Sequence, residues 1–175
     1  MTAMPEQHDV VDLLTADHRA VRNLFEGYRA ATDPEQRRQL VDRMTVEVVR
    51  HSVAEEVHLY PTVRKALLAD EEIEELTEAE RILSDLDAVD PRDQRFDPLV
   101  RELMDVVSMH IRGEEDLVFP ELRERLTPEE RMALGLRVGE ATAAVHSVPP
   151  VSPEGPGPGR TLADRVRELL TGRTR

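Results

Sequence analysis

The sequence predicts an all-α protein: an up-down-up-down four-helix bundle with a fifth helix and a tethered C-terminal amphipathic helix. Apolar residues recur every three or four positions along the chain, which is the period of an α-helix. Glycine is rare before residue 135, and no stretch is rich in β-branched residues with the alternation of a strand. Four long periodic segments with short connections between them favour antiparallel packing as a bundle.

The four long helices are expected in order along residues 7–126. The first covers about residues 7–31, and the second follows Asp33-Pro34, an N-cap with proline in the first turn. Pro61 should kink or interrupt the second helix, because proline lacks the N–H that an α-helix needs. The third covers about residues 70–88, and the fourth starts at Asp97-Pro98, with Pro120 at a kink or an end.

The rest of the chain divides into three further parts. A capping box, Thr127 with Glu130, begins an extra helix over about residues 128–145, which completes a bundle domain of residues 1–146. Residues 147–159 are rich in proline and glycine and read as an extended linker. Residues 160–175 form a short basic helix, with five arginines against two acidic residues.

Composition excludes several classes of function. The chain has 175 residues, 36 acidic and 23 basic side chains, a net charge of −13 and no cysteine. Without cysteine there are no thiolate metal sites and no cysteine catalysis. The negative charge predicts that neither nucleic acid nor an anionic membrane is a partner. The first residues carry no signal peptide, and no apolar run approaches the roughly 20 residues of a membrane span, so we expect a cytoplasmic protein.

Polar side chains that can bind metal interrupt the apolar stripe of each long helix. Two helices share the pattern H-x-x-x-E, whose spacing puts both side chains on one face, about 6 Å apart along the axis. An unpaired carboxylate is costly to bury, whereas a shared metal centre would satisfy every member of the set. The candidate ligands are His18, His51, Glu55, Glu80, His110 and Glu114.

The ligand types indicate which metal is expected. Three imidazoles and three carboxylates are too many for one tetrahedral zinc ion, but they suit two carboxylate-bridged ions. Iron is the first choice and manganese the second. A ferritin-type site with Glu-x-x-His on two helices is a minor competitor, because Val107 stands where the fourth helix would need an acid.

Ordinary structural explanations exist for each residue taken alone. A single H-x-x-x-E pair is usually a surface contact, a lone histidine such as His18 usually a hydrogen-bonded core residue, and Glu80 ends an acidic run typical of a solvated face. The combination is harder to explain in this way, because two such pairs and His18 lie in phase with apolar stripes on three helices. The combination therefore favours a metal site.

At these residues the sequence resembles the haemerythrin-like (HHE cation-binding) family, over about residues 9–126. The resemblance rests on Asp17-His18-Arg19 and on two copies of H-x-x-x-E-E followed by an aromatic residue and proline, at 51–61 and 110–120. It implies a four-helix bundle with a non-haem di-iron centre, in which His18 and His51 would serve one iron, His110 the other, and Glu55 and Glu114 would bridge.

The sequence departs from the family pattern in the third helix. Leu76 stands where the family usually offers a histidine, so the second iron would lose a nitrogen ligand. His58, one turn beyond Glu55, is a candidate substitute. Tyr60 and Asp17 are candidates to hydrogen-bond the ligands, as metal-binding histidines commonly require.

Three functions remain open from the sequence. The first is a di-iron protein that binds, buffers or senses dioxygen or a related small molecule. The second is an enzyme that acts on peroxide or nitric oxide at the same centre, with Glu80 as a general acid. The third is an interaction module with a structural metal or none, whose basic tail helix docks on the bundle or on a protein partner that the sequence does not identify.

Overall fold

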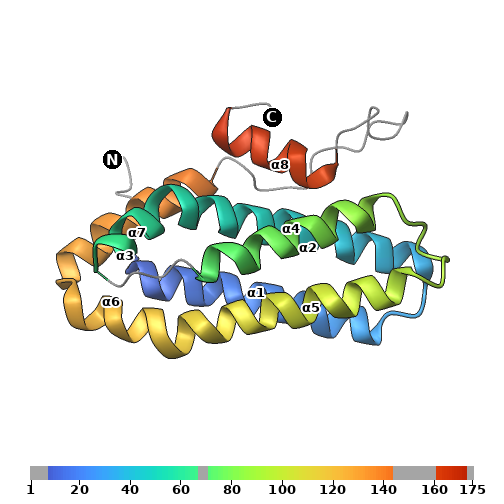
Figure 1. Ribbon diagram of the computed structural model, residues 1–175, viewed down its shortest axis with the longest axis horizontal. Helices are drawn as coiled ribbons and strands as arrows, with labels where there is room; N and C mark the ends of the chain where they lie inside the picture. Colours follow the sequence, from blue (N-terminus) through green and yellow to red (C-terminus); the bar gives the residue numbers. More distant parts are fainter. Residues whose placement is uncertain (1–7, 67–70, 144–160, 173–175) are drawn as a thin grey trace, which may run out of the picture.

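The four-helix bundle is confirmed in the computed structural model, which describes residues 8–66, 71–143 and 161–172. All regular structure in these ranges is helical, and four long rods lie side by side (Figure 1). The rods are α1 (Val10–Ala30); α2 (Pro34–Ala54) continued by η1 (Glu55–Leu59) and α3 (Tyr60–Ala66); α4 (Glu71–Asp87); and α5 (Phe96–Gly113) continued by η2 (Glu114–Val118) and α6 (Phe119–Arg125).

Side-chain caps fix several helix starts where the sequence predicts them. The Asp33 carboxylate accepts a hydrogen bond from the Gln36 N–H at 2.8 Å, at the start of α2. Thr127 and Glu130 form the predicted capping box at the start of α7 (Pro128–Thr142). Each cap satisfies backbone N–H groups that the first helical turn leaves unpaired.

The fourth rod starts one residue earlier than expected, at Phe96, and Asp97 is not its cap. The Asp97 carboxylate instead accepts a hydrogen bond from the Tyr28 hydroxyl at 2.5 Å and from Arg37 at 3.0 Å. This carboxylate therefore ties α5 to α1 and to the start of α2, a contact between distant parts of the sequence that local capping rules do not anticipate.

Both proline-containing repeats pass through a π turn before the helix continues. The Tyr60 N–H donates to the Glu55 carbonyl in η1, and the Phe119 N–H donates to the Glu114 carbonyl in η2. In an α-helix Pro61 and Pro120 would clash with the carbonyl four residues back, and the wider π turn relieves that clash. The predicted kink is thus a π turn, and each rod continues for a further seven-residue helix.

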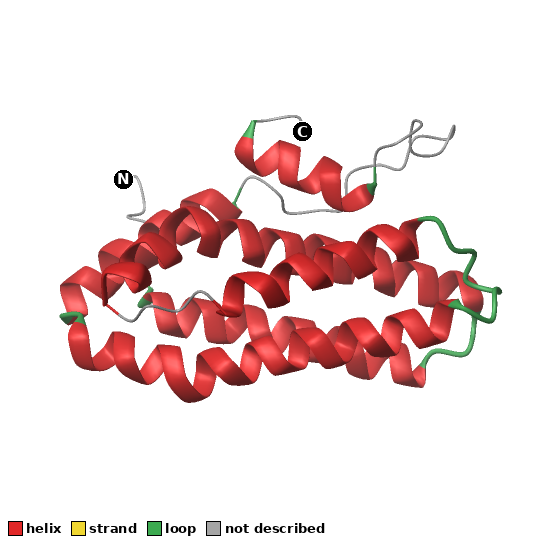
Figure 2. Cartoon of the chain, in the orientation of Figure 1, coloured by secondary structure: helices red, strands yellow, loops and turns green. Residues whose placement is uncertain are grey.

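Two further helices cover the bundle. α7 lies along α1 and η1, and α8 (Leu162–Thr171) packs on α2 and α4 (Figures 1 and 2). α8 begins with a capping box of Thr161 and Asp164. The linker expected over residues 147–159 lies outside the described residues, so the domain boundaries stay a prediction.

Two apolar clusters fill the bundle on either side of a polar layer. Along α1, Leu14 belongs to one cluster and Val21 to the other, and His18 stands between them. Along α5 and η2, Val107 and Val118 likewise belong to different clusters. Among the described helices, none combines the length and apolar character needed to cross a membrane.

Candidate metal centre

Five of the seven predicted ligand residues meet in the polar layer. His18 comes from α1, His51 from α2 and His110 from α5, while Glu55 and Glu114 open the two π turns. All five are at most 5% exposed, and both glutamates are fully buried. Buried carboxylates in an apolar core require partners, and the cluster supplies them.

The closest group consists of His18, His51, Glu55 and Glu114. One nitrogen or oxygen atom from each lies within 4.8 Å of the others, a separation at which one cation could contact all four. The His18 Nε2 is 3.0 Å from the Glu114 Oε2, and the His51 Nε2 is 3.0 Å from the Glu55 Oε1. The two Nε2 atoms are 3.3 Å apart, so both rings point at the same space.

His110 adjoins this group on the other side of the two carboxylates. Its Nε2 is 3.5 Å from the Glu55 Oε2 and 3.4 Å from the Glu114 Oε2. Glu55 therefore presents one oxygen to His51 and the other to His110.

Neighbouring side chains orient the ligands. The His18 Nδ1 lies 3.0 Å from a Glu115 oxygen, and because an ionised carboxylate can only accept, Nδ1 donates there and the ring is oriented with Nε2 toward the cluster. The guanidinium of Arg22 holds Glu115 through two contacts, at 3.0 and 2.7 Å. The Phe119 ring stacks on His18, with centroids 5.4 Å apart.

Asp17 of α1 and Tyr60 of α3 adjoin the candidate ligands His51 and Glu55, as the sequence suggested. Asp17 has an oxygen 4.0 Å from the His51 Nδ1, and the Tyr60 hydroxyl donates to the Glu55 Oε2 at 3.0 Å. A phenol that donates to a carboxylate stabilises its charged form.

Electrostatics favour charged groups in the cluster when no metal is present. Burial alone would lower the pKa of His51 and of His110, but the nearby carboxylates outweigh burial and raise both pKa values above the ordinary 6.5. Burial would raise the pKa of Glu55, and the neighbouring imidazoles instead hold that pKa well below 4.5. The pairing of opposite charges thus compensates for desolvation.

Several atoms of the cluster still have no hydrogen-bond partner. They include one oxygen each of Glu55 and Glu114, together with the His110 Nε2. Leaving such buried groups unpaired costs free energy, so native proteins rarely do so without a reason. Nitrogen and carboxylate donors without thiolates fit iron or manganese ions. Of the unpaired atoms, the Glu55 Oε1 lies 3.0 Å from the His51 Nε2 and the His110 Nε2 lies 3.4 Å from the Glu114 Oε2, so both adjoin other candidate ligand atoms.

Glu80 and His58 lie outside the cluster. The Glu80 carboxylate accepts a hydrogen bond from the Ser52 hydroxyl at 3.3 Å and pairs with Arg167 of α8. His58 lines a pocket of about 520 Å³ between η1, α7 and α8, and burial and Arg137 lower its pKa. The side chain of Leu76 lies outside the described residues.

Sequence reasoning missed the two arginines that hold acidic residues beside the ligands, Arg22 and Arg167. The feature of the sequence that could have indicated these arginines is the pair of adjacent glutamates in each repeat. Its first glutamate points into the cluster, and its second, Glu56 or Glu115, pairs with an arginine.

A family model, described as the Hemerythrin HHE cation binding domain, matches residues 9–122. The chain therefore belongs to the hemerythrin HHE cation-binding family, and its buried histidine and glutamate cluster could hold a metal ion.

Two curated relatives extend this assignment. An uncharacterized hemerythrin-like protein of Schizosaccharomyces pombe is 28% identical over 178 residues, which cover 92% of this chain and 86% of that protein. A protein of Nostoc sp. (strain PCC 7120) named DNA nickase is 30% identical over 126 residues, 70% of this chain but only 36% of the relative. The chain thus spans about a third of that protein's length. No solved structure gives a match.

Proposed function

We propose that this protein binds a non-haem di-iron centre and uses it to interact with dioxygen or with a related small molecule such as nitric oxide or peroxide. The observation that carries the proposal is the buried layer of three imidazoles and two carboxylates, several of whose atoms have no partner within the protein. Manganese is the less favoured substitute for iron.

The proposed ligands are His18, His51, Glu55, His110 and Glu114. The two oxygens of Glu55 face different histidines, as expected of a carboxylate that bridges two ions. A bound iron pair would supply reversible redox chemistry toward dioxygen or a related species. The protein's own part is to bring three imidazole rings and two carboxylates into one buried layer and to surround them with apolar side chains.

The decisive experiment is a metal count on protein purified from iron-supplemented cells, together with visible spectra recorded with and without oxygen. We expect close to two irons per chain and an absorption band that bleaches on reduction. Return of the band with oxygen favours binding or sensing, whereas rapid gas evolution from peroxide favours an enzyme. Near-zero iron in a protein with an intact helical spectrum would refute the di-iron proposal.

Variants separate the ligands from their neighbours. We expect His51→Ala to lower the iron content, because its Nε2 faces both Glu55 and His18. His58→Ala should retain the wild-type iron content, because its side chain lies outside the cluster. Loss of iron in this control would return His58 to the set of candidate ligands.

A second candidate is an interaction module in which metal is structural or absent. The packing of α8 on α2 and α4 favours it, because this helix already occupies a face of the bundle. The same metal count separates the two candidates. The absence of a nucleic-acid partner, suggested by the net charge of −13, stays a prediction, and so does the cytoplasmic location.

A further inference from the structure

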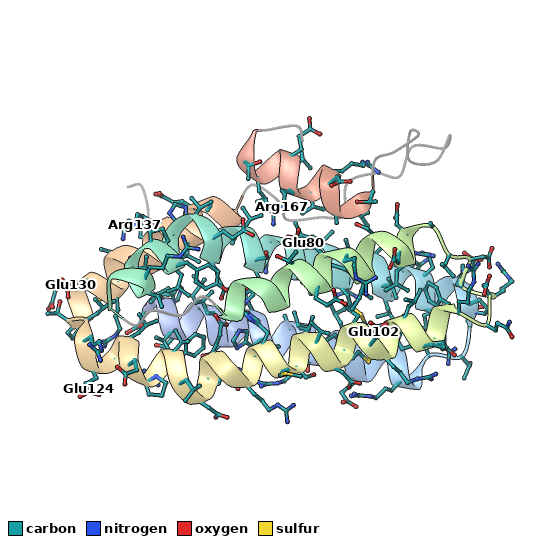
Figure 3. All side chains as sticks on the ribbon, in the orientation of Figure 1. Glu80, Glu102, Glu124, Glu130, Arg137 and Arg167 are labelled. Carbon is teal, nitrogen blue, oxygen red and sulfur yellow. The ribbon has the colours of Figure 1, made fainter. Side chains whose placement is uncertain are left out.

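One guanidinium on the C-terminal helix holds two carboxylates from different parts of the bundle. Arg167 contacts both oxygens of Glu56, at 2.9 and 3.1 Å, and also pairs with Glu80 on α4. Figure 3 shows Arg167 on α8 directly facing Glu80. Arg167 is 14% exposed and Glu80 18%, whereas Glu56 is 39% exposed, so the contact with Glu80 is better sheltered from screening by salt than the contact with Glu56.

Both carboxylates adjoin residues of the metal centre. Glu56 directly follows Glu55 in the π turn η1. Glu80 accepts a hydrogen bond from Ser52, which is fully buried and directly follows His51. Arg167 therefore links α8 to the two segments that present the ligands of the first repeat.

The second repeat has a similar brace, built from a different helix. Glu115 directly follows Glu114 in η2, and the guanidinium of Arg22 on α1 binds both its oxygens. The second glutamate of each repeat is thus held by an arginine fork, a geometry stronger than a single contact. α1 belongs to the four-helix bundle, whereas the brace of the first repeat comes from the tail.

Apolar packing places Arg167 accurately. Leu162, Ala163 and Val166 of α8 are buried in the same cluster as Val53 of α2 and Leu83 of α4. Apolar contacts thus hold the helix independently of its guanidinium, and the planar fork loses little further conformational freedom on pairing.

We propose that Arg167 is a positioning residue of the metal centre: docking of α8 braces η1, and thereby holds Glu55 where it binds metal. The segment η1 is a single π turn within a longer helical rod, a rare arrangement that is frequent at functional sites, and contacts from a neighbouring helix would fix the ligand at its start. The inference rests on the proposed metal-binding function and adds a regulated element to it, because the brace is present only while the tail helix is docked.

The test compares Arg167→Ala with wild type in the full chain, with Fe²⁺ added anaerobically as the probe. We expect Arg167→Ala to weaken iron binding by about 10-fold, the lower end of the range for residues that support metal ligands. Amide hydrogen exchange over residues 55–61 of the metal-free protein should become faster. Arg167→Lys, which keeps the charge but loses the fork, should fall between the two.

Two controls separate positioning from general stability. Arg29→Ala removes an exposed ion pair with Glu26 and should change neither readout. Val100→Ala removes methyl groups from a fully buried residue ten positions before His110, and it should lower the melting temperature without weakening iron binding. Glu56→Gln tests the same brace from its other partner and should match Arg167→Ala.

Equal iron affinity and equal exchange in wild type, Arg167→Ala and Glu56→Gln would overturn this inference while leaving the proposed function intact. A similar loss of affinity in Val100→Ala would also overturn it, because the effect would then follow stability alone. A wild-type protein that binds no iron would overturn the proposed function and this inference together.

Discussion

The two tyrosines of the chain offer a matched test of the metal centre. Tyr60 is 2% exposed and donates to the fully buried carboxylate of Glu55 at 3.0 Å. Tyr28 donates to Asp97 at 2.5 Å, away from the cluster. Tyr60→Phe and Tyr28→Phe each remove one hydroxyl that donates to a carboxylate, but only the first alters a proposed ligand.

The structure sets different magnitudes for the two changes. A buried hydrogen bond to a charged group contributes about 1.5–3 kcal/mol, so Tyr60→Phe should lower the melting temperature of the metal-free protein by about 3–12 °C. Asp97 is 42% exposed and keeps two contacts to Arg37. Water can replace the lost hydroxyl there, and Tyr28→Phe should therefore cost about 0.5–1.5 kcal/mol.

Metal affinity separates the two variants more sharply than stability. Loss of a residue that hydrogen-bonds a ligand typically weakens binding by about 10–100-fold, so Tyr60→Phe should shift an anaerobic Fe²⁺ titration by that factor. Tyr28→Phe should titrate like wild type. Equal iron affinity in both variants would refute the placement of Glu55 as a ligand supported by Tyr60.

Three further predictions concern the cluster and the packing around it. In metal-free protein, the raised pKa values of His51 and His110 contribute stability that is complete below about pH 6.5 and is lost as pH rises through their folded-state pKa values. The lowered pKa of Glu55 contributes stability that is present above about pH 4.5 and is lost as pH falls through its folded-state pKa. Iron affinity should instead rise with pH, because the ligands must be deprotonated, and parallel pH trends in urea unfolding and iron titration would contradict this. Glu115→Gln should weaken iron binding by about 10-fold through loss of the histidine partner, while Glu121→Gln, in an exposed pair, should not. Gly139→Ala should stabilise α7 by about 0.5–1 kcal/mol, because its Cβ would make only ordinary contacts. Gly135→Ala should cost about 1–3 kcal/mol, because its Cβ would lie 2.1 Å from the backbone oxygen of His8. Melting-temperature shifts of the same sign in both variants would contradict the packing of α7 beside the start of α1.

The sequence predicts most of the fold because its strongest signals are local. Asp33 and Thr127 cap helices by accepting from backbone N–H groups three residues away, so these starts follow from short segments. The fourth long helix was expected to start at Asp97, but it starts at Phe96, and a tyrosine 69 residues earlier in the chain donates to the Asp97 carboxylate. Local sequence signals do not anticipate a partner that is so distant in the chain.

The residues of the candidate site were likewise predictable only where the signal is local. His18, His51 and His110 were found because each lies in phase with an apolar stripe. His58 was expected on the face of Glu55 from α-helical spacing, and the π turn between them changes the rotation per residue, so His58 lies on the outer side of η1. Glu80 is also in phase with its stripe, but its partner Arg167 is 87 residues away, a distance over which periodicity carries no information.

Two copies of the H-x-x-x-E-E motif therefore form a candidate centre whose halves differ chemically. After the first repeat comes Tyr60, whose hydroxyl reaches a ligand carboxylate; after the second comes Phe119, whose ring stacks on His18. Glu115 contacts a ligand histidine directly, whereas Glu56 contacts the tail helix. Because these neighbours set the orientation and charge of the candidate ligands, they would distinguish the two metal positions of the proposed centre, which the H-x-x-x-E-E pattern alone would make equivalent.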